Sequence, residues 1–536
     1  MKWTKWACLL AGMMIWSGCG NMDNPEPTED ESAGGVYEYV PQGKADNYRS
    51  TEGREYLLTG TDTIDLSAEE DAQLTGEERE ERVQELVEYK FKALSYFLYA
   101  YLADKSSHDE NADYGGFRTT IRQQTFESLA IEEVDGEPGT YRFEFQAEAG
   151  GPMELVERIP RDVNGKFELI LPKLTNSELE SGSYSREYRH FTPEDYEESE
   201  LTSLEMGIEP QESEPDAYPE YNQMFQDGLL DVAIHVGGDY NDKRYDIETA
   251  EELFRTLQRD LDLEAPVESI EELESDSGPF VGSFEANGET IDLEVTLIYP
   301  EMHDEPGVGY DGLLELYRES ASEKDIVIYD GHAGYTSSYS GVVVHYDPRH
   351  AIAADDFDEL ELPDKHQLFV FNGCKTYTSY ADAMYDHPAK DAANLDIMTT
   401  VNFSWLSEMT RVTTDLLDNF LDQKAGTHAP RSYDHILAEM NKGRSWDVIY
   451  GVHGLDDNPH RSPYAQTDSL CRSCGDSTDC PGVDNVCLNL SGGQACTVAC
   501  TADSGCPDGY ACESVARQGS DLISAKQCVP TAGMCR

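Results

Sequence analysis

The placement of the cysteines constrains this chain more than any other feature of its sequence. Ten of the 13 cysteines lie beyond residue 470, in a segment rich in Gly and Asp. An even set of this size predicts a disulfide framework, which needs an oxidising compartment and substitutes for a core that so few apolar side chains cannot build. We assign residues 467–536 to a small disulfide-rich module with unknown pairing. Its cysteines are Cys471, Cys474, Cys480, Cys487, Cys496, Cys500, Cys506, Cys512, Cys528 and Cys535.

A zinc site is the alternative for the first two of these cysteines. Cys471 and Cys474 have the two-residue spacing of zinc ligands. No second pair of this kind completes a set of four ligands, so the sequence favours disulfides.

The N-terminus has the features of an export signal. Lys2 and Lys5 precede the apolar stretch ACLLAGMMIW, which is too short to span a bilayer. The following WSGC resembles the lipobox of bacterial lipoproteins. This resemblance implies a signal peptide over residues 1–18 and a lipid on Cys19 that anchors the protein in the cell envelope, at the outer membrane or the cell surface. An ordinary cleaved signal peptide is the alternative, and no later stretch is apolar enough to cross a membrane.

The charge of the chain excludes two classes of partner. There are 106 acidic and 39 basic residues, which gives a net charge of −67. Such a surface repels nucleic acid and anionic lipid, so we expect no nucleic-acid partner and no membrane contact except through the lipid. Acidic runs such as EEREERVQE are typical of solvated faces or linkers, with structural calcium binding and adaptation to salt as open alternatives. No other cofactor is expected.

Changes in pattern divide the rest of the chain into four segments. Residues 19–55 form an acidic tether and residues 181–223 an acidic linker, because neither has a clear period. Residues 56–180 contain a helix-periodic stretch, RVQELVEYKFKALSYFLYAYLAD, and the alternating strands TYRFEFQAEA and GKFELILP, which predict a small α+β domain. Residues 224–462 form a further domain.

This further domain alternates buried-type strands with amphipathic helices. LLDVAIHV, DIVIYDGH, LFVFNGC and LDIMTTVNF are expected strands, and DIETAEELFRTLQRDL, DGLLELYRES and VTTDLLDNFL are expected helices, the first capped by Asp246. Asn287-Gly288 supplies the turn of a hairpin. The alternation predicts an α/β fold with a parallel-rich sheet and helices on both faces.

Two of these strands end in reactive side chains. One runs into Gly331 and His332, and the other runs into Gly373 and Cys374, which lies apart from all other cysteines. Loops at the carboxyl ends of parallel strands meet at one crevice, so we expect His332 and Cys374 to face each other if the strands are neighbours. An imidazole beside a thiol activates it as a nucleophile, and glycines let backbone N–H groups approach a developing oxyanion.

The order apolar block, His, apolar block, Cys on an α/β sheet resembles the caspase–hemoglobinase fold of caspases, legumain, clostripain and gingipain. The resemblance covers about residues 224–462 and implies a cysteine endopeptidase that acts on a protein or peptide substrate. It assigns Cys374 as the nucleophile and His332 as the general base. The backbone around Gly373 and Cys374 would hold the oxyanion. In this chain Ala333 follows the histidine and Gly334 comes next, whereas the family usually has glycine immediately after its histidine.

Other interpretations remain open at this stage. The resemblance places Ser404 and Trp405 in a specificity pocket, although the tryptophan is equally well explained as structural. A relative that has lost activity and binds a surface partner would keep the same pattern. IYDGHAG also resembles metal-dependent PP2C-type phosphatases, in which Asp330 would hold two metal ions. The competing histidines are His345, His350 and His366, and His453-Gly454 is expected in a closing loop.

Overall fold

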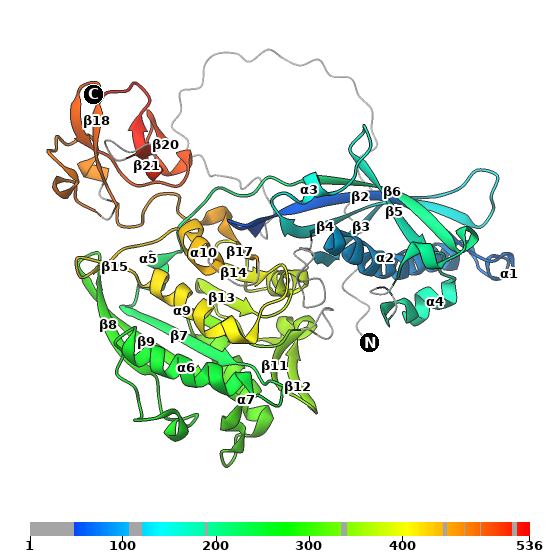
Figure 1. The fold of residues 1–536 in the computed structure, drawn as a ribbon, viewed down its shortest axis with the longest axis horizontal. Helices are drawn as coiled ribbons and strands as arrows, with labels where there is room; N and C mark the ends of the chain where they lie inside the picture. The colour runs from blue at the N-terminus through cyan, green and yellow to red at the C-terminus, as the bar shows by residue number, and fades with distance from the viewer. Residues whose placement is uncertain are drawn as a thin grey trace. The chain divides into compact units, whose positions relative to one another are not determined.

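The computed structural model describes residues 48–106, 120–186, 188, 191–333, 340–442, 448–465, 467–482, 484–516 and 523–535. The signal peptide, Cys19 and Gly334 lie outside these ranges, so the predictions made for them are not addressed by the structure. Figure 1 shows an N-terminal sheet with a long helix, a larger mixed α/β sheet, and a small C-terminal part with short strands.

The N-terminal sheet is antiparallel and has the strand order β3-β4-β2-β6-β5. Its strands are β2 (Gly53–Asp65), β3 (Thr120–Glu133), β4 (Thr140–Pro152), β5 (Lys166–Pro172) and β6 (Leu201–Pro210). Helix α2 (Gly76–Ser106) packs on the sheet and buries Leu86, Leu94 and Leu98. The core between them contains packed aromatic rings. Phe91 of α2, for example, contacts both Phe143 and Phe145 of β4.

Two segments that the sequence assigned to a linker and a tether belong to the fold instead. In β6, Leu204, Met206 and Ile208 are buried and alternate with outward residues, so this part of residues 181–223 is a sheet strand. Glu205 and Glu209 on the exposed face contributed to the acidic, aperiodic appearance of the segment. The chain before residue 56 is also ordered from Tyr48, because β1 (Tyr48–Arg49) and the start of β2 are hydrogen-bonded strands.

The larger sheet has the order β1-β17-β14-β13-β10-β7-β9-β8 and confirms the expected mixed α/β fold with parallel strands. Strands β9, β7, β10, β13 and β14 are parallel, and β8, β17 and β1 pair antiparallel at the two edges. The bounds are β7 (Leu229–Val236), β8 (Phe280–Ala286), β9 (Glu289–Ile298), β10 (Ile326–Asp330), β13 (Gln367–Asn372), β14 (Leu395–Thr400) and β17 (Tyr450–His453). The expected hairpin turn joins β8 to β9, with Asn287 at φ 51° and Gly288 at φ 89°.

Two side chains show that helices cover both faces of this sheet. Tyr329 of β10 pairs in register with His235 of β7, and the next residue, Asp330, pairs with Val236. Successive residues of a strand point to opposite faces. The ring of His235 contacts Ser320 of α7 (Gly309–Glu323), whereas Asp330 contacts Thr413 of α9 (Met409–Phe420). Helices α7 and α9 therefore lie on opposite faces.

Two further helices complete the cover on the face of α9. Helices α6 (Tyr245–Arg259) and α10 (Tyr433–Asn441) both pack against α9. The expected cap of α6 is wrong. Arg244 occupies the N-cap position at φ 52°, and Asp246 lies inside the first turn, where it forms an ion pair with Arg244. Arg244 therefore precedes the helix in a left-handed conformation and pairs with Asp246.

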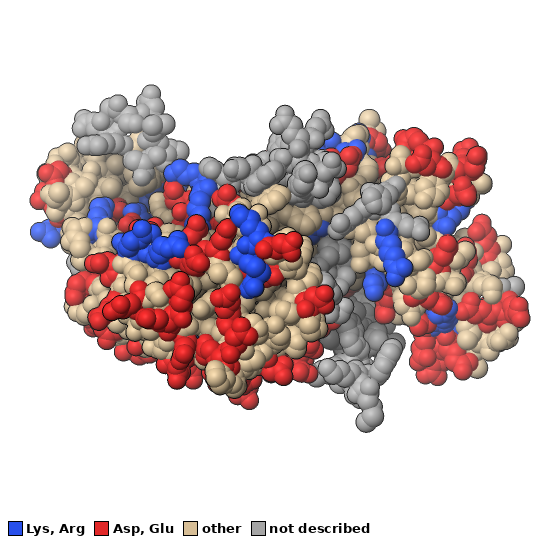
Figure 2. Space-filling view, turned by 60° about the horizontal axis from the view of Figure 1, so that its bottom comes forward, with Lys and Arg blue, Asp and Glu red and all other residues tan. Residues whose placement is uncertain are grey.

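Among the charged side chains visible in Figure 2, acidic ones predominate, and fewer Lys and Arg side chains lie among them. This distribution agrees with the excess of 106 acidic over 39 basic residues. Within the described ranges, no helix combines the length and the apolar character that crossing a bilayer requires.

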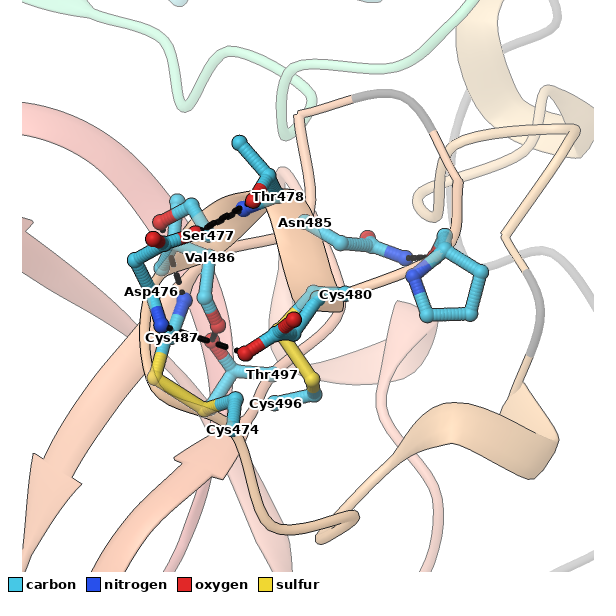
Figure 3. The surroundings of a disulfide bond; sticks show 12 residues. Cys474, Asp476, Ser477, Thr478, Cys480, Asn485, Val486, Cys487, Cys496 and Thr497 are labelled. Atoms are coloured by element: carbon cyan, nitrogen blue, oxygen red, sulfur yellow. Dashed lines mark hydrogen bonds between the residues drawn. A yellow bond between two sulfur atoms is a disulfide. The ribbon is translucent and has the colours of Figure 1, made fainter.

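The C-terminal segment contains five disulfides, as the cysteine pattern predicted. The pairs are Cys471–Cys535, Cys474–Cys487, Cys480–Cys496, Cys500–Cys512 and Cys506–Cys528. Within each of two successive groups of four, the first cysteine pairs with the third and the second with the fourth. Figure 3 shows this arrangement for the first group, beside the hairpin of β18 (Cys487–Leu490) and β19 (Gly493–Cys496). In the second group, Cys512 lies in β20 (Tyr510–Ala516) and Cys528 lies in β21 (Ile523–Pro530).

These pairs rule out the zinc alternative, because the sulfurs of Cys471 and Cys474 are each bonded to another cysteine. The close groups of three cysteine sulfurs in the described chain consist of disulfide sulfurs as well. Cys374 is the free cysteine of the residues that the structure describes.

Candidate catalytic site at the carboxyl ends of the parallel strands

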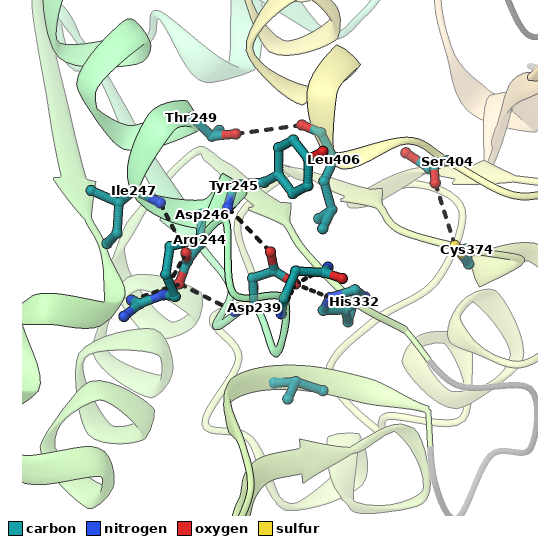
Figure 4. A network of polar contacts seen from close by, with 12 residues as sticks. Asp239, Arg244, Tyr245, Asp246, Ile247, Thr249, His332, Cys374, Ser404 and Leu406 are labelled. Atoms are coloured by element: carbon teal, nitrogen blue, oxygen red, sulfur yellow. Dashed lines mark hydrogen bonds and ion pairs between the residues drawn. The ribbon is translucent and has the colours of Figure 1, made fainter.

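The candidate site lies where four neighbouring strands end. From β7 the chain moves outward to β9 and then returns past β7 to β10, so the strand order reverses between β7 and β10. Such a reversal opens a crevice at the carboxyl ends of the strands. The residues after β7, β10, β13 and β14 that meet there are Asp239, His332, Cys374 and Ser404 (Figure 4).

The strands that precede His332 and Cys374, β10 and β13, are hydrogen-bonded neighbours, and their last residues are paired in register. Asp330 at the end of β10 is opposite Asn372 at the end of β13, and each reactive residue follows two positions later. The Gly331 N–H donates to the Asn372 carbonyl at 3.2 Å. A Cβ added to Gly373 would lie 3.0 Å from the Ala333 Cβ, so only glycine lets these two strand ends approach so closely.

Asp239 orients the ring of His332. His332 Nε2 lies 2.8 Å from Asp239 Oδ1, and the Asp239 side chain is fully buried beneath the ring. Tyr240 stacks on His332 with a centroid separation of 4.6 Å, and Tyr346 contacts the ring edge at 5.4 Å. Because Nε2 is engaged by the carboxylate, Nδ1 is the nitrogen left for proton transfer.

The surroundings of Asp239 keep its carboxyl group ionised. Burial acts to raise the pKa of Asp239, but hydrogen bonds from His332, Asn241 and Tyr245 outweigh burial and lower that pKa. The backbone N–H of Tyr245 donates to Asp239 Oδ2 at 3.1 Å, and Tyr245 begins helix α6. Backbone donors at a helix N-terminus favour negative charge. Asp239 is therefore a charged partner for an imidazolium.

The thiol of Cys374 contacts the backbone of Ser404 in this arrangement. Its Sγ donates to the carbonyl oxygen of Ser404 at 3.5 Å. Among the described residues no hydrogen bond joins Cys374 to His332, and Figure 4 shows the two contacts as separate dashed lines. Burial raises the pKa of the Cys374 thiol, although the Ser404 contact and the Lys375 charge act to lower it. The resting thiol is therefore protonated at neutral pH.

The backbone next to Cys374 can bind an anionic oxygen. Lys375 has φ 57° and ψ 39°, so the chain turns sharply after the cysteine, and the Lys375 N–H donates to the Asn402 carbonyl at 2.9 Å. No described residue accepts a hydrogen bond from the N–H of Cys374 itself. Within the described part of the chain this N–H therefore has no acceptor, and an oxyanion site requires a donor of this kind.

Ser404 contributes its backbone and not its hydroxyl to the site. The Ser404 hydroxyl donates to Asn372 Oδ1 at 2.8 Å, and the Tyr450 hydroxyl donates to the same oxygen at 2.7 Å. The serine side chain is therefore directed into the core. Trp405 is half-buried and packs against the core of the larger sheet. A specificity role for these two residues stays a prediction.

The competing histidines lie elsewhere. His345 Nδ1 donates to the Pro348 carbonyl at 2.7 Å in the hairpin of β11 (Gly341–Tyr346) and β12 (Arg349–Ala353), where His350 also lies. His366 directly precedes β13 and so lies at the amino end of that strand, whereas Cys374 follows its carboxyl end. His453 is the last residue of β17, bonded to Thr399, and not part of a closing loop as expected.

Asp330 is placed unfavourably for a metal site. Its side chain is fully buried, with one oxygen accepting from Asn372 Nδ2 at 2.8 Å and the other from Thr413 Oγ1 at 2.6 Å. Burial raises the pKa of Asp330 to about 7, against the effect of both hydrogen bonds. No close group of three acidic or histidine ligands was found in the described part of the chain. The donor set around Asp330 therefore does not fit a two-metal centre.

Sequence reasoning missed Asp239. It follows the strand LLDVAIHV and the dipeptide Gly237-Gly238, so the same signal that marked His332 and Cys374, a polar residue behind a strand-end glycine, was present. Comparison of the chain with protein-family models, with curated proteins and with solved structures gave no match.

Proposed function

We propose that this protein is a cysteine endopeptidase in which Asp239, His332 and Cys374 act together. The observation that carries the proposal is their common origin at the ends of three adjacent parallel strands, with the Asp239–His332 hydrogen bond already formed. A nucleophile, a base and a group that orients the base are the parts that covalent acyl transfer needs.

In the proposed reaction, Cys374, His332 and Asp239 each have a separate role. His332 Nδ1 takes the thiol proton as Cys374 Sγ attacks the carbonyl carbon of the scissile peptide bond, and Asp239 stabilises the imidazolium that forms. The N–H of Cys374 donates to the oxyanion. His332 then gives the proton to the leaving amine, and a thioester remains on Cys374. Water that loses a proton to His332 hydrolyses this thioester and restores the thiol.

The resting contact between Cys374 and Ser404 is consistent with a thiol that is activated only when substrate binds. The Sγ must rotate from the Ser404 carbonyl towards His332 before attack, and the raised pKa disfavours a preformed thiolate. Catalytic hydrogen bonds often form only once substrate is bound.

The cellular setting is part of the same proposal. Five disulfides support an oxidising compartment, and the lipobox-like WSGC supports a lipid on Cys19 in the cell envelope. Under this proposal the substrate is a protein or peptide outside the cytosol, and the lipid is the contact with the membrane.

A peptide library and four variants test the activity. Cys374→Ala and His332→Ala should abolish cleavage, and Asp239→Asn should lower kcat by about 10²-fold or more, because each member of such a unit depends on the others. His345→Ala, a histidine in the β11–β12 hairpin, is the matched control and should leave the rate unchanged. Iodoacetamide should inactivate the wild type. Cleavage that persists in Cys374→Ala would refute the proposal.

A surface-binding protein without activity is the second candidate. The absence of a His332–Cys374 hydrogen bond among the described residues, together with the protonated thiol, favours it. In that case no library peptide is cut, and Cys374→Ala leaves binding of the intact protein to its surface partner unchanged.

A further inference from the structure

The segment that follows Cys374 is fixed by the N-terminal sheet and its helix. The buried side chain of Lys375 places its Nζ 3.6 Å from the ring centroid of Tyr99 in α2. Tyr377 donates to Glu55 Oε1 of β2 at 2.7 Å. The hydroxyl of Thr378 is 3.2 Å from that of Thr120 in β3. Three residues within four positions of the proposed nucleophile thus contact the N-terminal sheet or its helix α2.

Arg122 of β3 is the centre of these contacts. Its side chain is fully buried and pairs with Glu55 at 3.3 Å and with Glu148 at 3.1 Å, both in the N-terminal sheet. The same guanidinium reaches Asp382 of α8 (Tyr380–Tyr385), which follows the turn after Cys374. Its carbon also lies 5.6 Å from the ring centroid of Tyr377. The Arg122 guanidinium therefore joins two carboxylates of the N-terminal sheet to helix α8, which follows the proposed nucleophile in the larger α/β part.

A buried ion network of this kind acts through geometry. Desolvation offsets most of the attraction in buried ion pairs, so such pairs contribute little net stability, whereas the planar guanidinium fixes the direction of each partner. The Arg122–Asp382 pair also has the Tyr377–Glu55 and Thr120–Thr378 contacts beside it. The whole of residues 375–382 is thereby held against the N-terminal sheet.

We propose that the N-terminal sheet is a permanent part of the catalytic site, with Arg122 as a positioning residue that sets Cys374 through Asp382 and residues 375–382. This inference rests on the proposed peptidase function. It implies that the N-terminal sheet is not an inhibitory segment that is removed to activate the enzyme, because removal would leave Asp382, Lys375 and Tyr377 without the partners described above.

Asp382→Asn tests the contact with the smallest disturbance, because Arg122 keeps Glu55 and Glu148 as partners. This variant should fold, lower kcat by about 10²-fold with little change in KM, and increase several-fold the rate at which iodoacetamide alkylates Cys374. Arg122→Met should have a larger effect on both rates, and Arg122→Lys should recover part of the loss because the positive charge remains.

The matched control breaks an ion pair of the N-terminal sheet that lies away from this contact. Asp62 of β2 pairs with Lys90 of α2 at 3.0 Å, and both side chains are largely buried. Asp62→Asn should lower the melting temperature without altering kcat or the alkylation rate. If Asp382→Asn behaves like Asp62→Asn, the positioning role is refuted. The alkylation rate is measured even if the wild type cuts no peptide, so the two proposals can fail separately.

Discussion

Two aspartates at neighbouring strand ends have pKa values that are shifted in opposite directions. Asp239 is surrounded by N–H donors, which lower its pKa despite burial, whereas Asp330 receives one amide and one hydroxyl donor in the core and has a pKa raised to about 7. Asp330 is more deeply buried and Asp239 has more donors, so both differences separate the two pKa values in the same direction. One can stabilise an imidazolium and the other serves the packing of α9 on the sheet.

The raised pKa of Asp330 predicts a pH-dependent stability difference. An unfolded aspartate ionises near pH 3.9 and the folded one near 7, so the folded state binds the extra proton between these values and stability falls as pH rises through this window. Asp330→Asn removes this dependence. Its unfolding free energy, relative to wild type, should increase from pH 4 to pH 7 by roughly 1.4 kcal/mol per pH unit at most and stay constant above. Urea titrations at several pH values measure it, and a difference that does not vary with pH would contradict the assignment.

The residues of the site were predictable to different degrees. His332 and Cys374 stand directly behind apolar strands with a glycine before each, which is a local signal. Asp239 is 93 positions before His332, and only the order of β7 and β10 in the sheet makes them partners. Arg122 and Asp382 are 260 positions apart and belong to different sheets, so no local pattern could join them.

At the scale of elements, burial on both sides made the parallel strands easy to predict. Strands β7, β10, β13 and β14 are nearly continuous apolar runs because helices cover both of their faces. Strand β6 has one exposed face, filled with Glu and Ser, which made it look like an acidic linker. The sequence therefore identified the sheet that carries the site better than the sheet that supports it.

The β8–β9 hairpin gives a prediction for a single turn. Gly288 has φ 89° and nothing within 4 Å of an added Cβ, so Gly288→Ala introduces backbone strain without a clash. We expect a loss of about 1–2 kcal/mol in unfolding free energy. The control is Gly76→Ala at the start of α2, which also has open space but no positive φ and should be neutral or stabilising. Equal effects of the two substitutions in denaturant titrations would contradict the expectation.

At the scale of the whole molecule, charge repulsion opposes compactness. Acidic residues outnumber basic ones by 106 to 39, and many of the ion pairs are on the surface, where each contributes little. The net charge of −67 therefore lowers the stability of the folded state through self-repulsion.

Salt should relieve this repulsion. Between 0.01 M and 1 M NaCl the screening length falls from about 30 Å to about 3 Å, so the melting temperature should rise steadily. A chelator in every sample ensures that trace calcium does not cause the effect. A melting temperature that stays constant or falls over this range would show that the surface ion pairs outweigh the repulsion.

The disulfide between Cys471 and Cys535 turns the C-terminal segment into a covalent ring, within which the other four bonds lie. A protease that cuts once between these two cysteines releases no fragment, because both new ends stay attached to the rest of the chain. Such damage would pass unnoticed on a gel without reductant and would separate the pieces only after reduction. A segment built in this way can be cleaved once and still remain on the protein that carries it.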